Sequence, residues 1–419
     1  MRASSGIAVR PGGDADLRSL FTDDARLLRF ARLAAAFLAP VTLVLAFAAC
    51  GFGPDPRHNW LGDVVGSDLS QVWVAGARAL AGRAAESYEL AVHLANLAAA
   101  FGPECRFAWH YPPVFLIPAA GLAALSPQVA ILAWMTLSLA VFTAATFVAT
   151  GRRDAVLIAL AHPLVFCNLT YGQNGLITAG LLTLGATLVD RRPWLAGLCF
   201  GLVAYKPQLA AFAPVVLLLT GRREALAACL GTALALCLAS VALFGLDPWR
   251  SFLTTLSETD RLLLRDAAAG LDINFSAFGT MRLFGGGMSA AWAFQAGVTG
   301  ATFALAWRVW SRCADTHLRA ATLLACVPMA SLYLPIYDLA PLIPATILLA
   351  IAAHRAGGLR GYERGLMILA PLTAAFRPLV NETGIPFGFL FAAATLLCVA
   401  ARALPAMPPR KVSTVAHPA

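Results

Sequence analysis

Charge is scarce in this sequence of 419 residues, because Asp, Glu, Lys and Arg together make up only 13% of it. A soluble domain is typically about a quarter charged, so the composition argues against a water-soluble protein. Hydrophobic residues make up 59% of the chain, and apolar runs of membrane-spanning length recur along it. The composition therefore predicts an all-α, polytopic integral membrane protein.

Several chemical signatures are also missing. No CxxC spacing occurs, and most of the nine cysteines fall inside apolar runs, so neither a zinc site nor a disulfide framework is indicated. The same cysteines serve well as small packing residues. The sequence has no HExxH, no GxSxG and no Gly-rich nucleotide loop. We therefore expect no metal and no cofactor.

Lysine is almost absent, with only Lys206 and Lys411, so the net charge of +9 comes mainly from arginine. In a membrane protein a basic excess usually marks cytoplasmic loops, and nucleic acid is not an expected partner. Some thirty polar, Arg-rich residues precede the first apolar run, 30–52. That run is too long for the apolar core of a signal peptide, so we expect no cleaved leader.

Thirteen apolar runs can be read along the chain, and the basic clusters between them predict the topology. The runs are 30–52, 113–125, 128–150, 155–170, 174–189, 193–205, 207–220, 224–244, 290–307, 320–336, 339–353, 365–376 and 384–401. The clusters are Arg26/Arg29/Arg32, Arg152/Arg153, Arg191/Arg192, Arg222/Arg223, Arg308/Arg312/Arg319, Arg355/Arg360/Arg364 and Arg402/Arg410/Lys411. If every cluster is cytoplasmic, each interval between clusters must hold an even number of spans.

Only the interval from Arg32 to Arg152 breaks this rule, because it holds three runs. The run 113–125 is short and proline-containing, so we interpret it as an interfacial or re-entrant helix. About twelve transmembrane helices remain, with both termini cytoplasmic.

This topology divides the chain into a tail, a membrane domain and a second tail. Residues 1–29 form the N-terminal tail, 30–401 the transmembrane domain and 402–419 the C-terminal tail. Two large loops, 53–127 and 245–289, then face the outer side, and the first of them carries the interfacial helices. The chemically varied polar residues collect on this outer side, which an anchor alone would not need.

Asp68 lies in the first outer loop, within "GSDLSQVW" (66–73). A carboxylate at a membrane surface can deprotonate a hydroxyl group, and partial burial raises its pKa toward a useful value. Alternatively, Asp68 caps a helix over residues 69–81. The local sequence leaves both interpretations open.

Lys206 stands at the end of an apolar run, in "AYKPQ" (204–208), next to the helix-breaking Pro207. Its ammonium group could hold an anionic group such as a phosphate. It could equally reach toward the membrane interface as a helix anchor. Pro207 indicates an irregular backbone, which usually lines a cavity in a membrane protein.

Weaker candidates lie in other outer segments. Two polar turns belong to this group: "YGQN" with Gln173 and Asn174, and "DINFSAFG" with Asn274 and Ser276. Their side chains could bind sugar hydroxyls or form hydrogen bonds with the backbone of the turn. Tyr111, in "FAWHYPPVF", is typical of an interfacial anchor, although the following prolines could also fix a helix over a lipid-facing entrance.

Asp338 lies between two apolar runs, in "IYDLAP". An acidic residue at that depth is a functional candidate, and a helix-capping role is the alternative.

Several of these motifs together resemble glycosyltransferase family 87, also called DUF2029. They are "SDLSQVWVAGARALAG", the YPP segment at 111–113, the GQ turn at 172–173, "RPWLAGLCFGLVAYKPQ" (192–208) and the NFS element at 274–276. The resemblance covers roughly residues 65–345, and the order of these motifs along the chain supports it. Near Asp338 the family often has a histidine-containing pattern, where this chain has "YLPIYDLAP".

The resemblance implies a GT-C-type helical bundle that transfers a hexose, often mannose, from a polyprenyl phosphate. The acceptor would be a lipid or glycan at the outer face of a bacterial inner membrane, and the anomeric centre would invert. The family's general base corresponds to Asp68. We expect Lys206 and Gln208 to bind the donor phosphate, and Tyr111, Gln173, Asn174, Asn274, Ser276 and Asp338 to contact substrate.

Two other classes of protein stay open on the sequence. A transporter or lipid flippase would explain many spans and intramembrane polar residues, but not a large outer loop with a carboxylate and an interfacial helix. A structural subunit of an envelope complex is the other alternative. Covalent product formation distinguishes the enzyme from both.

Overall fold

The computed structural model of this chain describes residues 20, 22–50, 58, 59, 64, 66–267 and 270–404. Within those ranges one isolated antiparallel bridge pairs His58 with Val64, and the remaining regular structure is helical. Labels beginning with η denote short 3-10 or π turns. The first half contains α1 (Asp24–Ala49), α2 (Ser67–Leu80), η2 (Ala84–Tyr88), α3 (Leu90–Phe101), η3 (Pro113–Phe115), α4 (Leu116–Ala123), α5 (Pro127–Thr150), α6 (Arg153–Leu160), α7 (Pro163–Thr170), α8 (Gly175–Leu188), α9 (Pro193–Leu202), η4 (Val203–Tyr205), α10 (Pro207–Ala210) and α11 (Phe212–Leu219). The second half contains α12 (Arg223–Phe244), α13 (Asp247–Asp260), η5 (Arg261–Arg265), η6 (Leu271–Ile273), α14 (Ala277–Leu283), α15 (Met288–Arg312), α16 (Thr316–Ala330), η7 (Ile336–Leu339), α17 (Leu342–Arg355), α18 (Gly361–Leu369), η8 (Ala370–Ala375), α19 (Phe376–Thr383) and α20 (Phe387–Ala403).

Four of these helical segments are long and apolar enough to cross a membrane: α1, α5, α12 and the segment Ile336–Arg355, which joins η7 to α17. Two bent pairs, α6 with α7 and α19 with α20, raise the number to six if each pair is one span. Several other expected spans are present as shorter apolar helices, α8 and α9 among them. The structure confirms an all-helical membrane protein with four to six candidate spans among the described residues. The count of twelve stays a prediction.

Prolines stand at the start of several helices of the bundle, and one of them divides an apolar run. Pro163, Pro193 and Pro207 each occupy the first turn of a helix, α7, α9 and α10 respectively. Proline has no N–H group and fits this position well, but it breaks a helix that continues through it. The bend between α6 and α7 is 60°. The break before Pro207 leaves Lys206 in an irregular segment between η4 and α10.

Small residues let the bundle pack closely beside these breaks. Gly197 and Gly201 lie one turn apart on α9 and face α12. A Cβ atom on Gly197 would lie 2.3 Å from the carbonyl oxygen of Ala225, and one on Gly201 would lie 2.6 Å from that of Cys229. Small residues at this spacing let two membrane helices approach each other's backbones. The contact holds α9, and therefore the start of the Lys206 segment, against α12.

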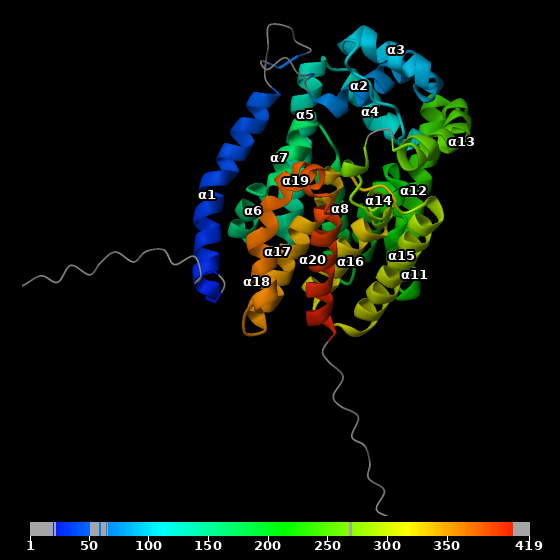
Figure 1. Ribbon diagram of the computed structural model, residues 1–419. Coiled ribbons are helices and arrows are strands. Elements are labelled where there is room, and N and C mark those ends of the chain that lie inside the picture. The colour runs from blue at the N-terminus through cyan, green and yellow to red at the C-terminus, as the bar shows by residue number, and fades with distance from the viewer. Residues whose placement is uncertain are drawn as a thin grey trace, which may run out of the picture.

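A cap of short helices covers one end of the bundle. Figure 1 shows α2, α3, α4 and α13 gathered at this end, above the longer helices. The helix α4, which falls within the run 113–125, packs against α2, where a Cβ atom on Gly76 would lie 2.0 Å from the carbonyl oxygen of Ala119. This cap corresponds to the two large loops that the topology places outside, and it closes one side of the candidate site.

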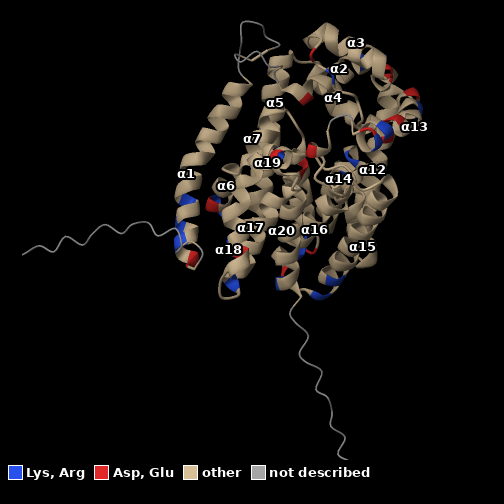
Figure 2. Ribbon diagram, in the orientation of Figure 1, with Lys and Arg blue, Asp and Glu red and all other residues tan. Residues whose placement is uncertain are grey.

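Basic residues gather at the opposite end. Figure 2 shows Lys and Arg at the ends of α1, α15, α18 and α20 that point away from the cap. Arg364 pairs there with Asp24 at 2.6 Å, and Arg402 pairs with Glu363 at 2.5 Å. The separation of a basic end from the cap agrees with the arrangement that the arginine clusters predict. The side of the membrane that each end faces stays a prediction.

Candidate active site

Asp68 lies in the first turn of α2, and its position is fixed by the turn that precedes α8. Gly66, which precedes α2, has a φ of 56°, a left-handed conformation that glycine adopts without strain. The backbone N–H of Asp68 donates to the carbonyl oxygen of Tyr171 at 3.1 Å. Its carboxylate Oδ2 accepts from Nε2 of Gln173 at 2.5 Å. The start of α2 has no hydrogen bond from a capping side chain. The interpretation of Asp68 as a helix cap therefore finds no support.

The surroundings of Asp68 suit a general base. The helix α2 is not among the candidate spans, and burial raises the pKa of Asp68 to about 6. The hydrogen bond from Gln173 and the charge of Lys206 oppose this rise by favouring the carboxylate form. At neutral pH the group is therefore mainly ionised, yet close enough to titration to accept a proton in a transition state.

Lys206 and Asp338 form a buried ion pair on another wall of the same cavity. The Nζ atom of Lys206 lies 2.5 Å from Oδ1 of Asp338, and both side chains are almost fully buried. The ammonium group also lies 5.2 Å from the ring centroid of Tyr337, within range of a cation–π interaction. We expected Lys206 to act as a separate cation. The structure instead pairs it with a second predicted residue, Asp338, which lies in η7.

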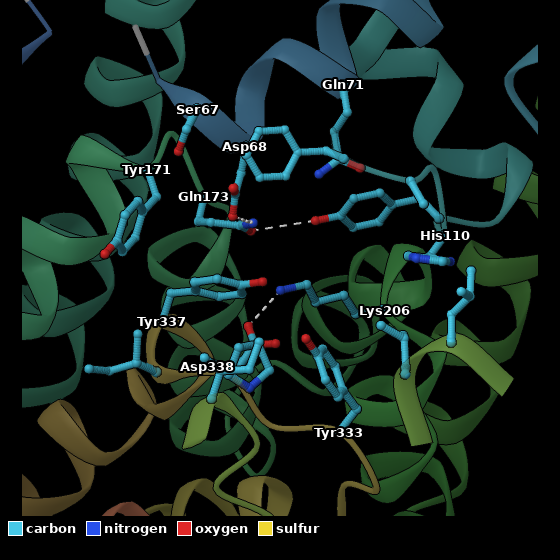
Figure 3. Close-up of a pocket in the computed structure, with 18 of the residues that line it drawn as sticks. Ser67, Asp68, Gln71, His110, Tyr171, Gln173, Lys206, Tyr333, Tyr337 and Asp338 are labelled. Carbon is cyan, nitrogen blue, oxygen red and sulfur yellow. Dashed lines mark hydrogen bonds and ion pairs between the residues drawn. The ribbon is translucent and has the colours of Figure 1, made fainter. Parts of the chain in front are cut away.

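These groups line one cavity of about 630 Å³ between the cap and the bundle. Figure 3 shows Asp68 with Gln173 on one side and Lys206 with Asp338 on the other. Both Gln208, on the exposed surface of α10, and Tyr111 also line the cavity. Six of the predicted site residues thus meet here although the chain carries them on five separate segments.

Tyr111 connects two of the amide side chains. Its hydroxyl accepts from Nδ2 of Asn174 at 2.9 Å and lies 3.5 Å from Oε1 of Gln173. Since Gln173 uses its amide nitrogen for Asp68, this network orients the Gln173 side chain and selects which atom faces the carboxylate. Asn174 is buried behind the cavity and does not line it. Its contribution is therefore to position Tyr111.

Asn274 and Ser276 bind the backbone and do not line the cavity. The Nδ2 of Asn274 donates to the carbonyl oxygen of Leu332 at 3.2 Å, and its Oδ1 accepts from the N–H of Leu334 at 3.0 Å. The hydroxyl of Ser276 donates to the same Leu332 oxygen and caps α14. The two residues hold the segments before α14 and before η7 together. Direct contact between either side chain and a substrate stays a prediction that this geometry does not favour.

The sequence interpretation missed several cavity residues. Arg106 and Arg377 add positive charge to the lining, and Tyr205, Tyr333 and Tyr337 add aromatic rings. Arg377 pairs with Asp272 at 2.7 Å, yet just over half of its side chain stays exposed. The signal for Arg377 was an arginine that lies apart from the basic clusters of the sequence, and the structure places it at the start of α19.

His110 is a further missed residue of the lining. Its Nδ1 atom lies 3.0 Å from the hydroxyl of Thr259 on α13. Burial lowers the pKa of His110 to about 4, so the imidazole is neutral at pH 7. A neutral imidazole can donate or accept a hydrogen bond but supplies no charge to an anion. The contact also ties α13 to the cavity wall.

The lining suits transfer of a group to a hydroxyl. Asp68 can accept a proton, the cations can meet an anionic leaving group, and the tyrosines and amides can bind a sugar. Among the described residues no group of three or more His, Cys, Asp or Glu side chains is arranged to hold a metal ion.

Comparison with known proteins gives the class of the enzyme. The model of glycosyltransferase family 87 matches residues 109–335, more than half of the chain. The match includes Lys206 and Gln173, whereas Asp68, Asp338 and Arg377 lie outside it. Searches of curated proteins and of solved structures found no match. Because the match spans most of the bundle and carries the Lys206 wall of the cavity, the chain belongs to glycosyltransferase family 87, a family of membrane glycosyltransferases.

Proposed function

We propose that this enzyme transfers a hexose, with mannose the first candidate, from a polyprenyl monophosphate to a hydroxyl group of a lipid or glycan. The reaction takes place at the outer face of a bacterial inner membrane, in a GT-C-type bundle of twelve spans with both termini in the cytoplasm. One observation supports this most: the isolated, buried carboxylate of Asp68 shares a cavity with a lysine–aspartate pair.

Asp68 is the general base of this proposal. The acceptor hydroxyl lies against its carboxylate and gives up its proton as the oxygen bonds to C1 of the sugar. The bond from C1 to the phosphate oxygen breaks at the same time, and its electron pair stays on the phosphate. Attack from the face opposite the phosphate inverts the anomeric centre. Gln173 orients the carboxylate and keeps it ionised.

The cations of the cavity receive the departing phosphate. Lys206 supplies charge that is already oriented, and Gln208 follows it on α10. Because Asp338 neutralises much of the charge on Lys206, a phosphate needs a further cation. Arg106 and the half-exposed Arg377 also line the cavity, and we take Arg377 as the first candidate. Preorganised positive charge of this kind stabilises the charge that develops on a leaving group.

The donor reaches the cavity from the membrane, and the acceptor reaches it from the side of the cap. A polyprenyl phosphate is confined to the membrane, so its sugar must be presented near the membrane surface. The cap formed by α2, α3, α4 and α13 adjoins the cavity from the side that the topology assigns to the outer loops. An acceptor can approach Asp68 beneath this cap.

The test is product formation by the purified protein in lipid. Candidate polyprenyl-phosphate sugars are added with a lipid extract as acceptor, and mass spectrometry identifies the products. We expect a glycosylated product from the wild type and a loss of roughly 10²–10⁴-fold in the rate with Asp68→Asn, the contribution of a general base.

The matched control is Asp247→Asn on α13. The Asp247 side chain is 77% exposed and pairs with a similarly exposed arginine, so its loss should leave the rate unchanged. Transfer at the wild-type rate by Asp68→Asn would remove Asp68 as the base. Flux of lipid across proteoliposomes without a covalent product would favour a flippase instead.

A further inference from the structure

A second, smaller cavity lies beside the active-site cavity. It has a volume of about 300 Å³, and seven of its eight lining residues are apolar. Met281 and Phe284 line it from the α14 side, Phe294 from α15, and Phe389 and Leu390 from α20. The rings of Phe294 and Phe389 lie 5.9 Å apart. We call this site the apolar groove.

The groove opens toward the surroundings of the protein. The side chain of Phe284 is 65% exposed and that of Leu390 is 47% exposed, although both line the groove. In the apolar belt of a membrane protein such exposure means contact with lipid chains. A hydrocarbon chain can therefore enter this groove from the bilayer.

One wall separates the groove from the active-site cavity. Phe275 lines the cavity and packs against Gly388, where a Cβ atom would lie 2.4 Å from the Phe275 ring. The next residue, Phe389, lines the groove. Met281 of the groove packs in the same small cluster as Tyr333 of the cavity lining. The polar active-site cavity and the apolar groove are thus separated by the thickness of one side chain.

A charged pair marks the cavity side of this wall. Arg377 lines the cavity and pairs with Asp272, while the neighbouring Phe376 packs on Phe275 with 6.4 Å between ring centroids. The order is therefore a carboxylate and a buried lysine in the cavity, an arginine at its edge, an aromatic wall, and an apolar groove. A molecule with a sugar, a phosphate and a long hydrocarbon chain has the same order.

We propose that the apolar groove binds the first isoprene units of the polyprenyl tail of the donor, and that the tail passes over the Phe275–Gly388 wall beside Arg377. This inference rests on the proposed function, because it takes a polyprenyl phosphate as the donor. A membrane phospholipid could also place a chain in the groove, but it would bring no sugar to Asp68. The groove then gives the enzyme a preference for a donor with an isoprenoid tail over one without it.

The first experiment compares Leu390→Trp, which fills the groove, with Leu397→Trp. Leu397 is 68% exposed on the same helix, lies outside the groove and serves as the control. Each purified variant is assayed with two donors that carry the same sugar. The long donor is a polyprenyl phosphate of eleven isoprene units, and the short donor carries only a methyl group on its phosphate and so has no tail to enter the groove. We expect the ratio of kcat/KM for the long donor to that for the short donor to fall about tenfold in Leu390→Trp, which corresponds to losing the burial of roughly two methylene groups. The ratio should stay at the wild-type value in Leu397→Trp. An unchanged ratio in Leu390→Trp, including an equal loss on both donors, overturns the proposal.

A second experiment does not depend on transfer. A sugar-free polyprenyl phosphate with a photoreactive group on its first isoprene unit is irradiated with the wild type in lipid vesicles, and the labelled peptides are sequenced. We expect labelling within 280–294 and 385–390, reduced by excess polyprenyl phosphate but not by excess phosphatidylglycerol. Labelling elsewhere, or equal competition by phosphatidylglycerol, overturns the groove as a donor site. Because this result needs no product, it distinguishes failure of the groove from failure of the proposed function.

Discussion

The carboxylate of Asp68 accepts a hydrogen bond from the amide of Gln173 at 2.5 Å, although the two residues are 105 positions apart in the chain. The bond joins the first turn of α2 to the turn before α8. It also places a hydrogen-bond donor on Asp68, which, unlike Asp338, has no ion pair with a basic side chain among the described residues. The position and the ionisation of the proposed base therefore depend on the same contact.

The pH dependence of transfer follows from this contact. A general base must be deprotonated, so kcat/KM should rise as the pH increases through about 6, the pKa of Asp68. The bond from Gln173 lowers that pKa, and its removal in Gln173→Leu should shift the acidic limb of the profile to higher pH. The measurement is kcat/KM against pH for both enzymes. Identical acidic limbs would show that Gln173 does not tune the base.

The Lys206–Asp338 pair should matter for stability as well as for donor binding. Lys206→Met leaves the buried Asp338 without its partner, so we expect the free energy of unfolding to fall by about 3–5 kcal/mol. The double variant Lys206→Met/Asp338→Leu removes both charges and should recover most of that loss. Denaturant unfolding of the single and double variants in detergent gives the coupling between the two sites. Simple additivity of the two single effects would contradict a strong pair.

The same double variant also separates stability from catalysis. It should unfold near the wild-type denaturant concentration while its KM for the donor rises, because the phosphate has lost one cation. Wild-type donor kinetics in a stable double variant would remove Lys206 from the phosphate site.

Arg377 should affect the donor more than the acceptor. Arg377→Leu removes a cation from the edge of the cavity, and we expect KM for the donor to rise about tenfold, the effect of losing one hydrogen bond to a charged group. Asp272→Asn releases Arg377 from its partner and should lower the same KM. Arg250→Leu is the control, since Arg250 pairs with Asp247 on the exposed surface of α13. Equal kinetics for Arg377→Leu and Arg250→Leu would exclude a role for Arg377 at the phosphate.

The contact between α9 and α12 gives a prediction for folding. A Cβ atom in Gly197→Ala would meet the carbonyl oxygen of Ala225, and the backbone must move apart, at an expected cost of about 1–3 kcal/mol. Gly231→Ala on α12 is the matched control, because nothing lies within 4 Å of its Cβ position. Alanine there should stabilise the helix by about 0.5–1 kcal/mol. The midpoints of denaturant unfolding should move in opposite directions, and equal shifts would contradict the packing argument.

Composition and motif order were sufficient for the class of the protein. In lipid, an apolar and weakly charged chain has to make the hydrogen bonds of its backbone N–H and C=O groups within itself. Hydropathy alone therefore predicted helices. The KPQ block with its preceding WLAG indicated the family, which the match over 109–335 confirms. The number of spans was harder to predict, because Pro163 divides the apolar run 155–170 and several other runs form helices too short to cross a membrane by themselves.

The partners of the site residues could not be predicted. Lys206 appeared as a lone cation because Asp338 lies 132 positions away, and no local pattern records which side chains meet across a bundle. Arg377 was overlooked because a single arginine outside the basic clusters forms no recognisable pattern. Asn274 and Ser276 had the composition of a binding turn, yet the structure uses their side chains on the backbone of the segment before η7.

By itself the sequence determined that the chain is a helical membrane protein and supplied candidates for the residues of its site, since hydropathy and residue type are local properties. Only the tertiary structure decided that Asp68 is buried against Gln173, that Lys206 is neutralised by Asp338, and that an apolar groove lies one side chain from the cavity. Burial, pKa and charge balance depend on neighbours brought from distant parts of the chain, and helix packing alone sets those neighbours.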